Sequence, residues 1–234
     1  MRTDVVIAGA GPVGLSLALE LSNHGVRSIV IERKAMNAPT TVRCNHVSSR
    51  SMEFFRKNGF ADAVRNAGMP SDYAQDISYR ITTSGRELSR IKIAASGDRF
   101  TQRDTGVDAD WPTAEPPQRV NQLYLEPIMI ETAMARDEIT VLFEHELTEF
   151  SQDADKVIAS ARSKDGTQLQ IEASFLAGCD GGNSIVRQSI GGEFHGDAVI
   201  QRVQSTYLRA PDLISRMQVE PSWCMFSLNP RRSG

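Results

Sequence analysis

The stretch DVVIAGAGPVG, residues 4–14, determines how this chain begins to fold. A short apolar run precedes a glycine-rich turn, and apolar residues then recur at helical spacing to about residue 23. A second apolar run, SIVIE at residues 28–32, ends in Glu32, about 20 residues after the glycine turn. This order of strand, glycine turn, helix and strand with a terminal carboxylate predicts a βαβ unit that binds a dinucleotide.

Each residue of the glycine turn has a separate expected role. Gly9 permits a tight turn, Gly11 lets a pyrophosphate approach the backbone, and Gly14 lets the helix pack closely on the strand. Pro12 and Val13 begin the helix, whose free N–H groups and positive dipole end would face the phosphates. The turn therefore predicts a site for a diphosphate.

Glu32 predicts which adenosine this site prefers. Its carboxylate can accept hydrogen bonds from ribose hydroxyls, and its negative charge would oppose a 2′-phosphate. Arg33 follows directly and weakens that electrostatic argument. We expect an adenosine without a 2′-phosphate.

An alternative interpretation of the same stretch is a secretory signal, because Met1 and Arg2 precede the apolar run. The hydrophobic segment of such a signal would be a helix interrupted by three glycines and a proline. Glu20 stands where a small-residue cleavage site is expected. No run reaches ~18 apolar residues, the length of a membrane span. We expect a soluble, cytoplasmic protein with no membrane partner.

Composition and charge are those of an ordinary globular protein. The 234 residues are 40% hydrophobic and 24% charged, so a sizeable core can form. A formal net charge of -3 indicates no electrostatic footprint for nucleic acid, and no such partner is expected. The three cysteines and four histidines lack the spacing of a zinc site, so we expect no metal and a reducing compartment.

The rest of the chain alternates between helical and strand patterns. Helices are expected at residues 49–58, 61–67, 122–136 and 184–190. Strands are expected at residues 76–81, 88–93, 139–143, 146–150, 156–162, 169–175, 199–208 and 223–228. Pro127 fits its helix only in the first turn, where N–H groups lack partners in any case. Residues 95–118 lack an apolar period and predict a long loop.

Four separated motifs resemble those of the class A flavoprotein monooxygenases, the family of para-hydroxybenzoate hydroxylase and the phenol hydroxylases. They are the glycine fingerprint of residues 9–32, Arg43 with RSME at 50–53, QLYLE at 122–126, and GCDGGNSIVR at 178–187. The last, an Asp-Gly motif, is the most specific, and all four follow the family's order. The resemblance implies an α/β fold with a Rossmann-like FAD-binding domain of the glutathione-reductase type and an inserted, mostly β substrate domain.

The resemblance also implies domain boundaries. Residues 1–75 and 119–195 would form the FAD-binding domain. Residues 76–118 would form the hairpin and loop of the substrate domain, and residues 196–234 would begin its sheet. The alternative is one α/β domain with decorations.

The family's cofactor would lie across the glycine turn. The residues implied to hold the FAD pyrophosphate are Gly9, Gly11, Pro12, Val13 and Gly14. Glu32 and Arg33 would surround the adenosine ribose, and Leu147 is a weaker candidate beside the adenine.

Three further residues acquire roles from the resemblance. Arg43 and Gln122 would contact the pyrophosphate and ribityl side of FAD, and Asp180 would lie near the pyrophosphate and the path of NAD(P)H. Read without the family, Arg43 is a solvated loop arginine, Gln122 caps a helix, and Asp180 is an ordinary turn residue.

The implied reaction depends mainly on the flavin. NAD(P)H would reduce FAD, O2 would add to the reduced ring, and the flavin hydroperoxide would hydroxylate a phenolic or other aromatic substrate. The expected partners are therefore a small aromatic substrate and O2, with a homodimer as the expected assembly. No catalytic residue is assigned. Candidates facing the substrate are His46, Tyr79, Tyr207, Trp223 and Met225, although an aromatic residue on a strand is more often part of the core.

The chain also departs from the family. A later Gly-Asp motif is absent, since Gly196-Asp197 lies too early and precedes a strand pattern. We expect no strand to return after residues 223–228, which would leave an unpaired edge. The chain is therefore expected to be the N-terminal portion of a longer enzyme. Two alternatives stay open: a truncated, non-catalytic nucleotide-binding or self-associating domain, and an FAD-dependent reductase on the same scaffold.

Overall fold

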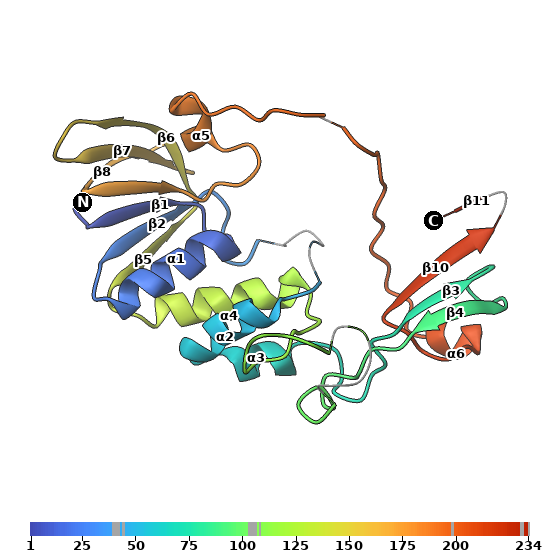
Figure 1. Cartoon of the computed structure of the whole chain (residues 1–234). Coiled ribbons are helices and arrows are strands. Elements are labelled where there is room, and N and C mark those ends of the chain that lie inside the picture. Colours follow the sequence, from blue (N-terminus) through green and yellow to red (C-terminus); the bar gives the residue numbers. More distant parts are fainter. Residues whose placement is uncertain are drawn as a thin grey trace. The chain divides into compact units, whose positions relative to one another are not determined.

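The chain forms two compact units, each built from two segments. The computed structural model describes residues 1–38, 43, 45–102, 107, 109–197, 199–229 and 232–233. The first unit comprises Met1–Thr41 and Leu125–Arg202, and the second comprises Val42–Tyr124 and Val203–Gly234. Figure 1 labels their helices and strands.

The first unit is centred on a four-stranded parallel sheet of order β5-β2-β1-β9. Its strands are β1 (Val5–Ala8), β2 (Ser28–Glu32), β5 (Ile139–Phe143) and β9 (Phe175–Gly178). The residues of β1 are all buried, as parallel strands covered on both faces require. Because all four strands run the same way, their carboxyl ends meet at one edge, where α/β sheets bind ligands.

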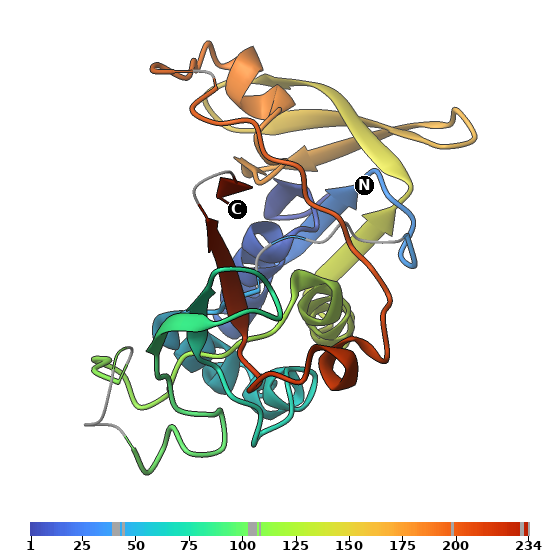
Figure 2. The same cartoon turned by 90° about the vertical axis from the view of Figure 1, so that its right-hand side faces the viewer.

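Different layers cover the two faces of this sheet. Helix α1 (Pro12–Asn23) and an antiparallel sheet of β6 (His145–Gln152), β7 (Val157–Ser163) and β8 (Gln168–Ala173) lie on opposite sides, as Figures 1 and 2 show. The two sheets share one core, whose buried members are Val6, Ala8, Ile29, Ile31, Leu147, Ala159, Ala161, Ile171, Ala173 and Val186. The last residue belongs to the short helix α5 (Ile185–Ser189).

The second unit contains a mixed sheet of order β11-β10-β3-β4. Its strands are β3 (Ile77–Arg80), β4 (Glu87–Ile91), β10 (Cys224–Asn229) and β11 (Arg232–Ser233), and its helices are α2 (Ser49–Lys57), α3 (Ala61–Asn66) and α6 (Leu213–Met217). Strands β10 and β3 pair in parallel although they are far apart in the sequence. Helix α4 (Gln122–Met134) begins in the segment of the second unit and continues in that of the first. None of the described helices has the length and hydrophobicity needed to cross a bilayer.

Most expected elements are confirmed, and two expectations at the end of the chain are wrong. The described residues 199–208 form no strand, and their apolar side chains are exposed, with Ile200 at 93%. An alternating pattern makes a strand only where a partner supplies hydrogen bonds. Such a partner exists for β10, because β11 returns antiparallel to it, with Leu228 opposite Ser233. Strand β10 is therefore paired on both sides, with β3 and with β11.

The two units divide the chain differently from the expected domains. Residues 42–75 group with the β3–β4 hairpin and not with the glycine turn. Two contacts join this segment to residues 115–118, which belong to the same unit. The backbones of Val47 and Gln118 exchange hydrogen bonds of 2.8 and 3.0 Å, and Arg65 on α3 forms an ion pair of 2.6 Å with Glu115.

The position of Pro127 in α4 differs from the expected one. The helix begins at Gln122, so Pro127 lies inside it and beyond the first turn. Its ring nitrogen cannot donate to the carbonyl of Leu123, four residues earlier, and one helical hydrogen bond is lost. Its side chain is exposed, which leaves room for the ring.

We expect Pro127→Ala to raise the free energy of unfolding by about 1–2 kcal/mol, because a donor is restored at an exposed helical position. Urea unfolding measures the change. Glu131→Ala, exposed on the same helix, is the control and should change stability by less than about 0.5 kcal/mol. A destabilised Pro127→Ala protein would contradict this account of the helix.

Candidate functional site

The glycine turn is shaped by contacts that exclude side chains. Gly9 has a φ of 101°, and a Cβ there would lie 2.5 Å from the carbonyl oxygen of Cys179. A Cβ on Gly14 would overlap the carbonyl oxygen of Gly9. Gly14 is thus in close contact with the glycine turn itself and with the side chain of Cys179. Backbone packing alone therefore requires glycine at positions 9 and 14, whether or not a ligand binds.

The aspartate turn lies directly beside the glycine turn. Strands β1 and β9 pair in parallel with Ala8 opposite Gly178, and the Cys179 N–H donates to the Ala8 carbonyl at 2.8 Å. Asp180 follows immediately. Burial raises the pKa of the Cys179 thiol, so the thiol stays neutral where a diphosphate would approach.

Gly11 marks the open side of the turn. It is the N-cap of α1, no side chain caps this end, and no acidic residue stands in the first turn. A Cβ on Gly11 would meet nothing within 4 Å. The first N–H groups of the helix therefore face an open space that suits a phosphate.

Glu32 connects the glycine turn to the end of β2. One carboxylate oxygen accepts the Ala10 N–H at 2.9 Å, and the other accepts the Lys34 N–H at 2.9 Å. Each oxygen has further acceptor capacity, so hydroxyl donors can still bind. The carboxylate thus orients the turn and can also receive a ribose.

Asp180 has one occupied and one unoccupied carboxylate oxygen. Oδ2 accepts the N–H groups of Ile185 at 2.7 Å and Val186 at 3.3 Å, at the start of α5. Oδ1 is buried and has no hydrogen-bond partner among the described residues. Such an oxygen is unfavourable unless a donor reaches it, and a hydroxyl of a bound cofactor would supply one.

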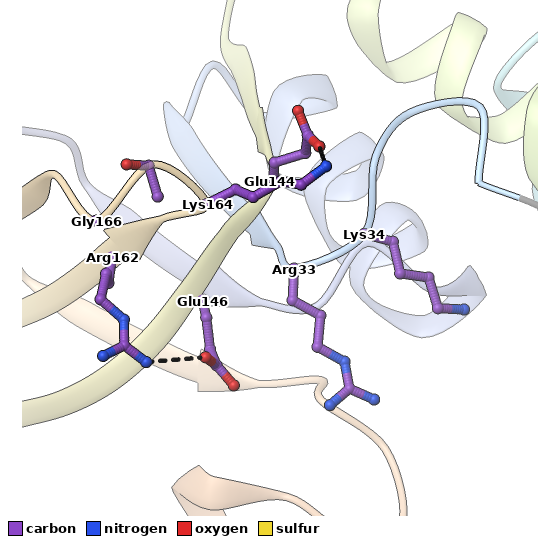
Figure 3. Close-up of a pocket in the computed structure, with 8 residues that line it drawn as sticks. Arg33, Lys34, Glu144, Glu146, Arg162, Lys164 and Gly166 are labelled. Carbon is purple, nitrogen blue, oxygen red and sulfur yellow. Dashed lines mark hydrogen bonds and ion pairs between the residues drawn. The ribbon is translucent and has the colours of Figure 1, made fainter.

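An open cavity of about 640 Å³ lies beyond Glu32, between the end of β2 and the β6–β8 sheet. Figure 3 shows Lys164 paired with Glu144 at 2.9 Å and Arg162 close to Glu146 at 3.5 Å, while Arg33 extends separately. The lining residues are Arg33, Lys34, Glu144, Glu146, Arg162, Ser163, Lys164 and Gly166. The volume is within the range of small-molecule sites, which is about 300–1,000 Å³.

The turn between β7 and β8 is ordered by Asp165. The hydroxyl of Ser163 and the N–H of Thr167 lower the pKa of this carboxyl to about 2. The carboxylate is therefore ionised at neutral pH and holds the turn beside the cavity.

The other expected site residues are placed as follows. Leu147 is buried in the core between the sheets, so its side chain packs there and only its backbone could reach a ligand. Arg43 is exposed in the second unit, and Gln122 begins α4. Their expected contacts with a cofactor stay predictions, as does the role of Arg33. Cys44, one of the three cysteines that lack the spacing of a zinc site, lies outside the described residues.

The five substrate-facing candidates all belong to the second unit. Tyr79 stacks on Phe226 with ring centroids 5.2 Å apart, Tyr207 is exposed, and Trp223 lies against Arg119. Sequence reasoning missed Arg119, as it missed Arg162 and Lys164, because no local motif distinguishes them. Among the described residues, no group of three His, Cys, Asp or Glu side chains could hold a metal ion.

Two glycines of the turn give a matched test of this geometry. We expect Gly14→Ala to lower the free energy of unfolding by at least about 2 kcal/mol, because its Cβ overlaps backbone. Gly11→Ala should cost less than about 1 kcal/mol, since its Cβ points into open space. Chemical denaturation of both variants checks the contrast. Equal destabilisation would show that the turn is packed differently.

Comparison with known proteins shows what this arrangement is similar to. The family described as FAD binding domain matches residues 2–234. The FAD-dependent monooxygenase apdD of Emericella nidulans is 31% identical over 98% of this chain and 37% of its own length. The 2,4-dichlorophenol 6-monooxygenase of Cupriavidus pinatubonensis is 31% identical over 80% of this chain and 30% of its own length.

A solved structure of a flavin enzyme is also similar to this chain. The rebeccamycin biosynthetic enzyme RebC with reduced flavin aligns with a TM-score of 0.71 and 31% identity, covering 82% of this chain and 35% of that one. The chain thus spans about a third of the length of the proteins it matches.

Proposed function

This chain belongs to the family of FAD binding domains, and on that premise we propose that it holds the FAD of a longer aromatic hydroxylase. The whole enzyme would use NAD(P)H and O2 to hydroxylate a phenolic or other aromatic substrate. One observation carries the proposal: the Asp180 turn and the glycine turn lie side by side at the carboxyl edge of the sheet. The relative that acts on a dichlorophenol supports the choice of substrate class.

The residues of the first unit fit the parts of FAD. Gly9, Gly11, Pro12, Val13 and Gly14 would hold the diphosphate, because the uncapped start of α1 offers N–H groups and a positive dipole end. The open space at Gly11 supports this assignment, since a side chain there would occupy the position of the phosphates.

The carboxylates of this unit would bind hydroxyl groups. Glu32, with Arg33 beside it, would accept the adenosine ribose, and the cavity beyond it has room for the adenine. Asp180 would accept a hydroxyl through its unpartnered Oδ1. Arg43, Gln122 and the backbone of Leu147 are further proposed contacts.

The bound flavin supplies the redox chemistry, taking electrons from NAD(P)H and activating O2. The part of this chain is to bind and orient the cofactor. The aromatic substrate, a homodimeric assembly and a cytoplasmic location are also part of the proposal. We also propose that the whole enzyme includes residues outside this chain.

FAD titration of two variants tests the binding site. Gly11→Ala should weaken FAD binding by about tenfold or more, equivalent to about 1.4 kcal/mol. Its stability should be nearly unchanged. Asp180→Asn should also weaken FAD, because its carboxamide oxygen can still accept the α5 N–H groups while the NH2 group replaces the acceptor Oδ1. Flavin absorbance after gel filtration measures how much FAD each of the two variants retains. If both variants retain wild-type affinity, FAD does not lie across this turn.

Oxygen uptake by the full-length protein tests the reaction. With bound FAD, addition of NADH or NADPH and a panel of phenols should give substrate-dependent uptake and a hydroxylated product. A colourless protein without flavin would favour a non-catalytic nucleotide-binding or self-associating domain. Nucleotide oxidation without hydroxylated product would favour a reductase on the same scaffold.

A further inference from the structure

A single residue, Glu144, links the two sheets of the first unit. Strand β5 ends at Phe143 and strand β6 begins at His145, so the chain passes from the parallel sheet to the antiparallel one within one residue. Glu144 makes this passage with a φ of 55°, in the left-handed region. A residue other than glycine rarely adopts that conformation, and it persists only where neighbouring contacts maintain it.

The backbone of Glu144 continues the hydrogen bonding of both sheets. Its N–H donates to the Lys34 carbonyl at 3.0 Å, beyond the last pair of β5 with β2. Its carbonyl accepts the Lys164 N–H at 2.9 Å, beyond the last pair of β6 with β7. The N–H and the carbonyl lie on opposite sides of the bond that φ describes. A change to a negative φ would therefore turn one of these groups away from its partner.

Lys34 connects Glu144 to the carboxylate that is proposed to receive the ribose. Lys34 accepts the Glu144 N–H with its carbonyl and donates its own N–H to Oε1 of Glu32 at 2.9 Å. Oε2 of Glu32 accepts the Ala10 N–H of the glycine turn, also at 2.9 Å. A chain of hydrogen-bonded residues therefore runs from the sheet junction at Glu144 to the glycine turn.

The side chain of Glu144 takes no direct part in these contacts. Its carboxylate pairs with the Lys164 ammonium at 2.9 Å, as Figure 3 shows, and the two side chains are 43% and 79% exposed, respectively. An exposed ion pair of this kind contributes little to stability. The backbone conformation of residue 144, and not its charge, is therefore the property that acts on Glu32.

We propose that Glu144 is a positioning residue for cofactor binding, because its left-handed backbone holds Lys34 where it orients the Glu32 carboxylate toward the adenosine ribose. The inference rests on the proposed function and deepens it, since residue 144 sets how well the site selects ribose hydroxyls. Each carboxylate oxygen of Glu32 accepts one backbone N–H and keeps capacity for a hydroxyl donor. A carboxylate held on both sides loses little freedom when ribose binds, whereas one held on a single side must first be ordered.

Substitutions that change the backbone preference of residue 144 test the inference. Glu144→Val disfavours a positive φ, because β-branched residues rarely adopt it, whereas Glu144→Gly adopts it freely. The probes are ADP and 2′,3′-dideoxy-ADP, which share the diphosphate and the adenine but differ in the ribose hydroxyls. Calorimetry should show that Glu144→Val weakens ADP binding by about tenfold and leaves dideoxy-ADP binding unchanged. Glu144→Gly should bind both probes as the wild type does.

Three further variants control this comparison. Lys164→Met removes the ion pair but keeps the backbone bonds, so it should change ADP affinity by less than about twofold. Glu144→Ala should weaken ADP binding by about threefold, and it takes the place of the valine variant if that one does not fold. In a Glu32→Ala background, Glu144→Val should cause no further loss of ADP affinity, because residue 144 acts through the missing carboxylate.

Amide hydrogen exchange on the free chain separates this inference from the proposed function. The Ala10 and Lys34 amides should exchange faster in Glu144→Val than in Glu144→Gly or the wild type. Equal exchange in the two variants, equal weakening of both probes by Glu144→Val, or an equal loss of ADP affinity in Glu144→Gly would overturn the inference. The expected exchange difference in a chain that binds neither FAD nor ADP would instead count against the proposed function alone.

Discussion

The parallel pairing of β1 with β9 is the constraint on which the candidate site depends. These strands lie at opposite ends of the first unit's sequence, and their hydrogen bonds align Ala8 with Gly178. The Cys179 N–H extends the ladder by one bond to the Ala8 carbonyl. Two turns that carry separate sequence motifs therefore meet at one edge of the sheet.

This meeting adds to the demand for glycine that the local turn geometry already makes. Side chains at Gly9 and Gly14 would collide with backbone from the neighbouring turn or from the turn itself, and one at Gly178 would lie 2.7 Å from Val186. Gly11 differs, because its missing side chain leaves open space. Packing thus accounts for three glycines, and the proposed diphosphate would account for the fourth.

The two units use long-range pairing in similar ways. In the first, it places polar groups where a dinucleotide can bind: an uncapped helix start, the Glu32 carboxylate and the buried Oδ1 of Asp180. In the second, the pairing of β10 with β3 places Trp223 against Arg119. Pairing between distant segments therefore brings specific side chains together in each unit.

The sequence by itself determined the βαβ start, the positions of its glycines and Glu32 within it, and the family resemblance, because these depend on local spacing. Helix α1 has the expected bounds for that reason. Only the tertiary structure decided that residues 199–208 form no strand, that β11 closes the edge of β10, and that residues 42–75 join the second unit. It also decided that Arg119 meets Trp223. Each of these outcomes depends on which distant segment supplies a hydrogen bond or a packing surface, and no local pattern encodes that choice.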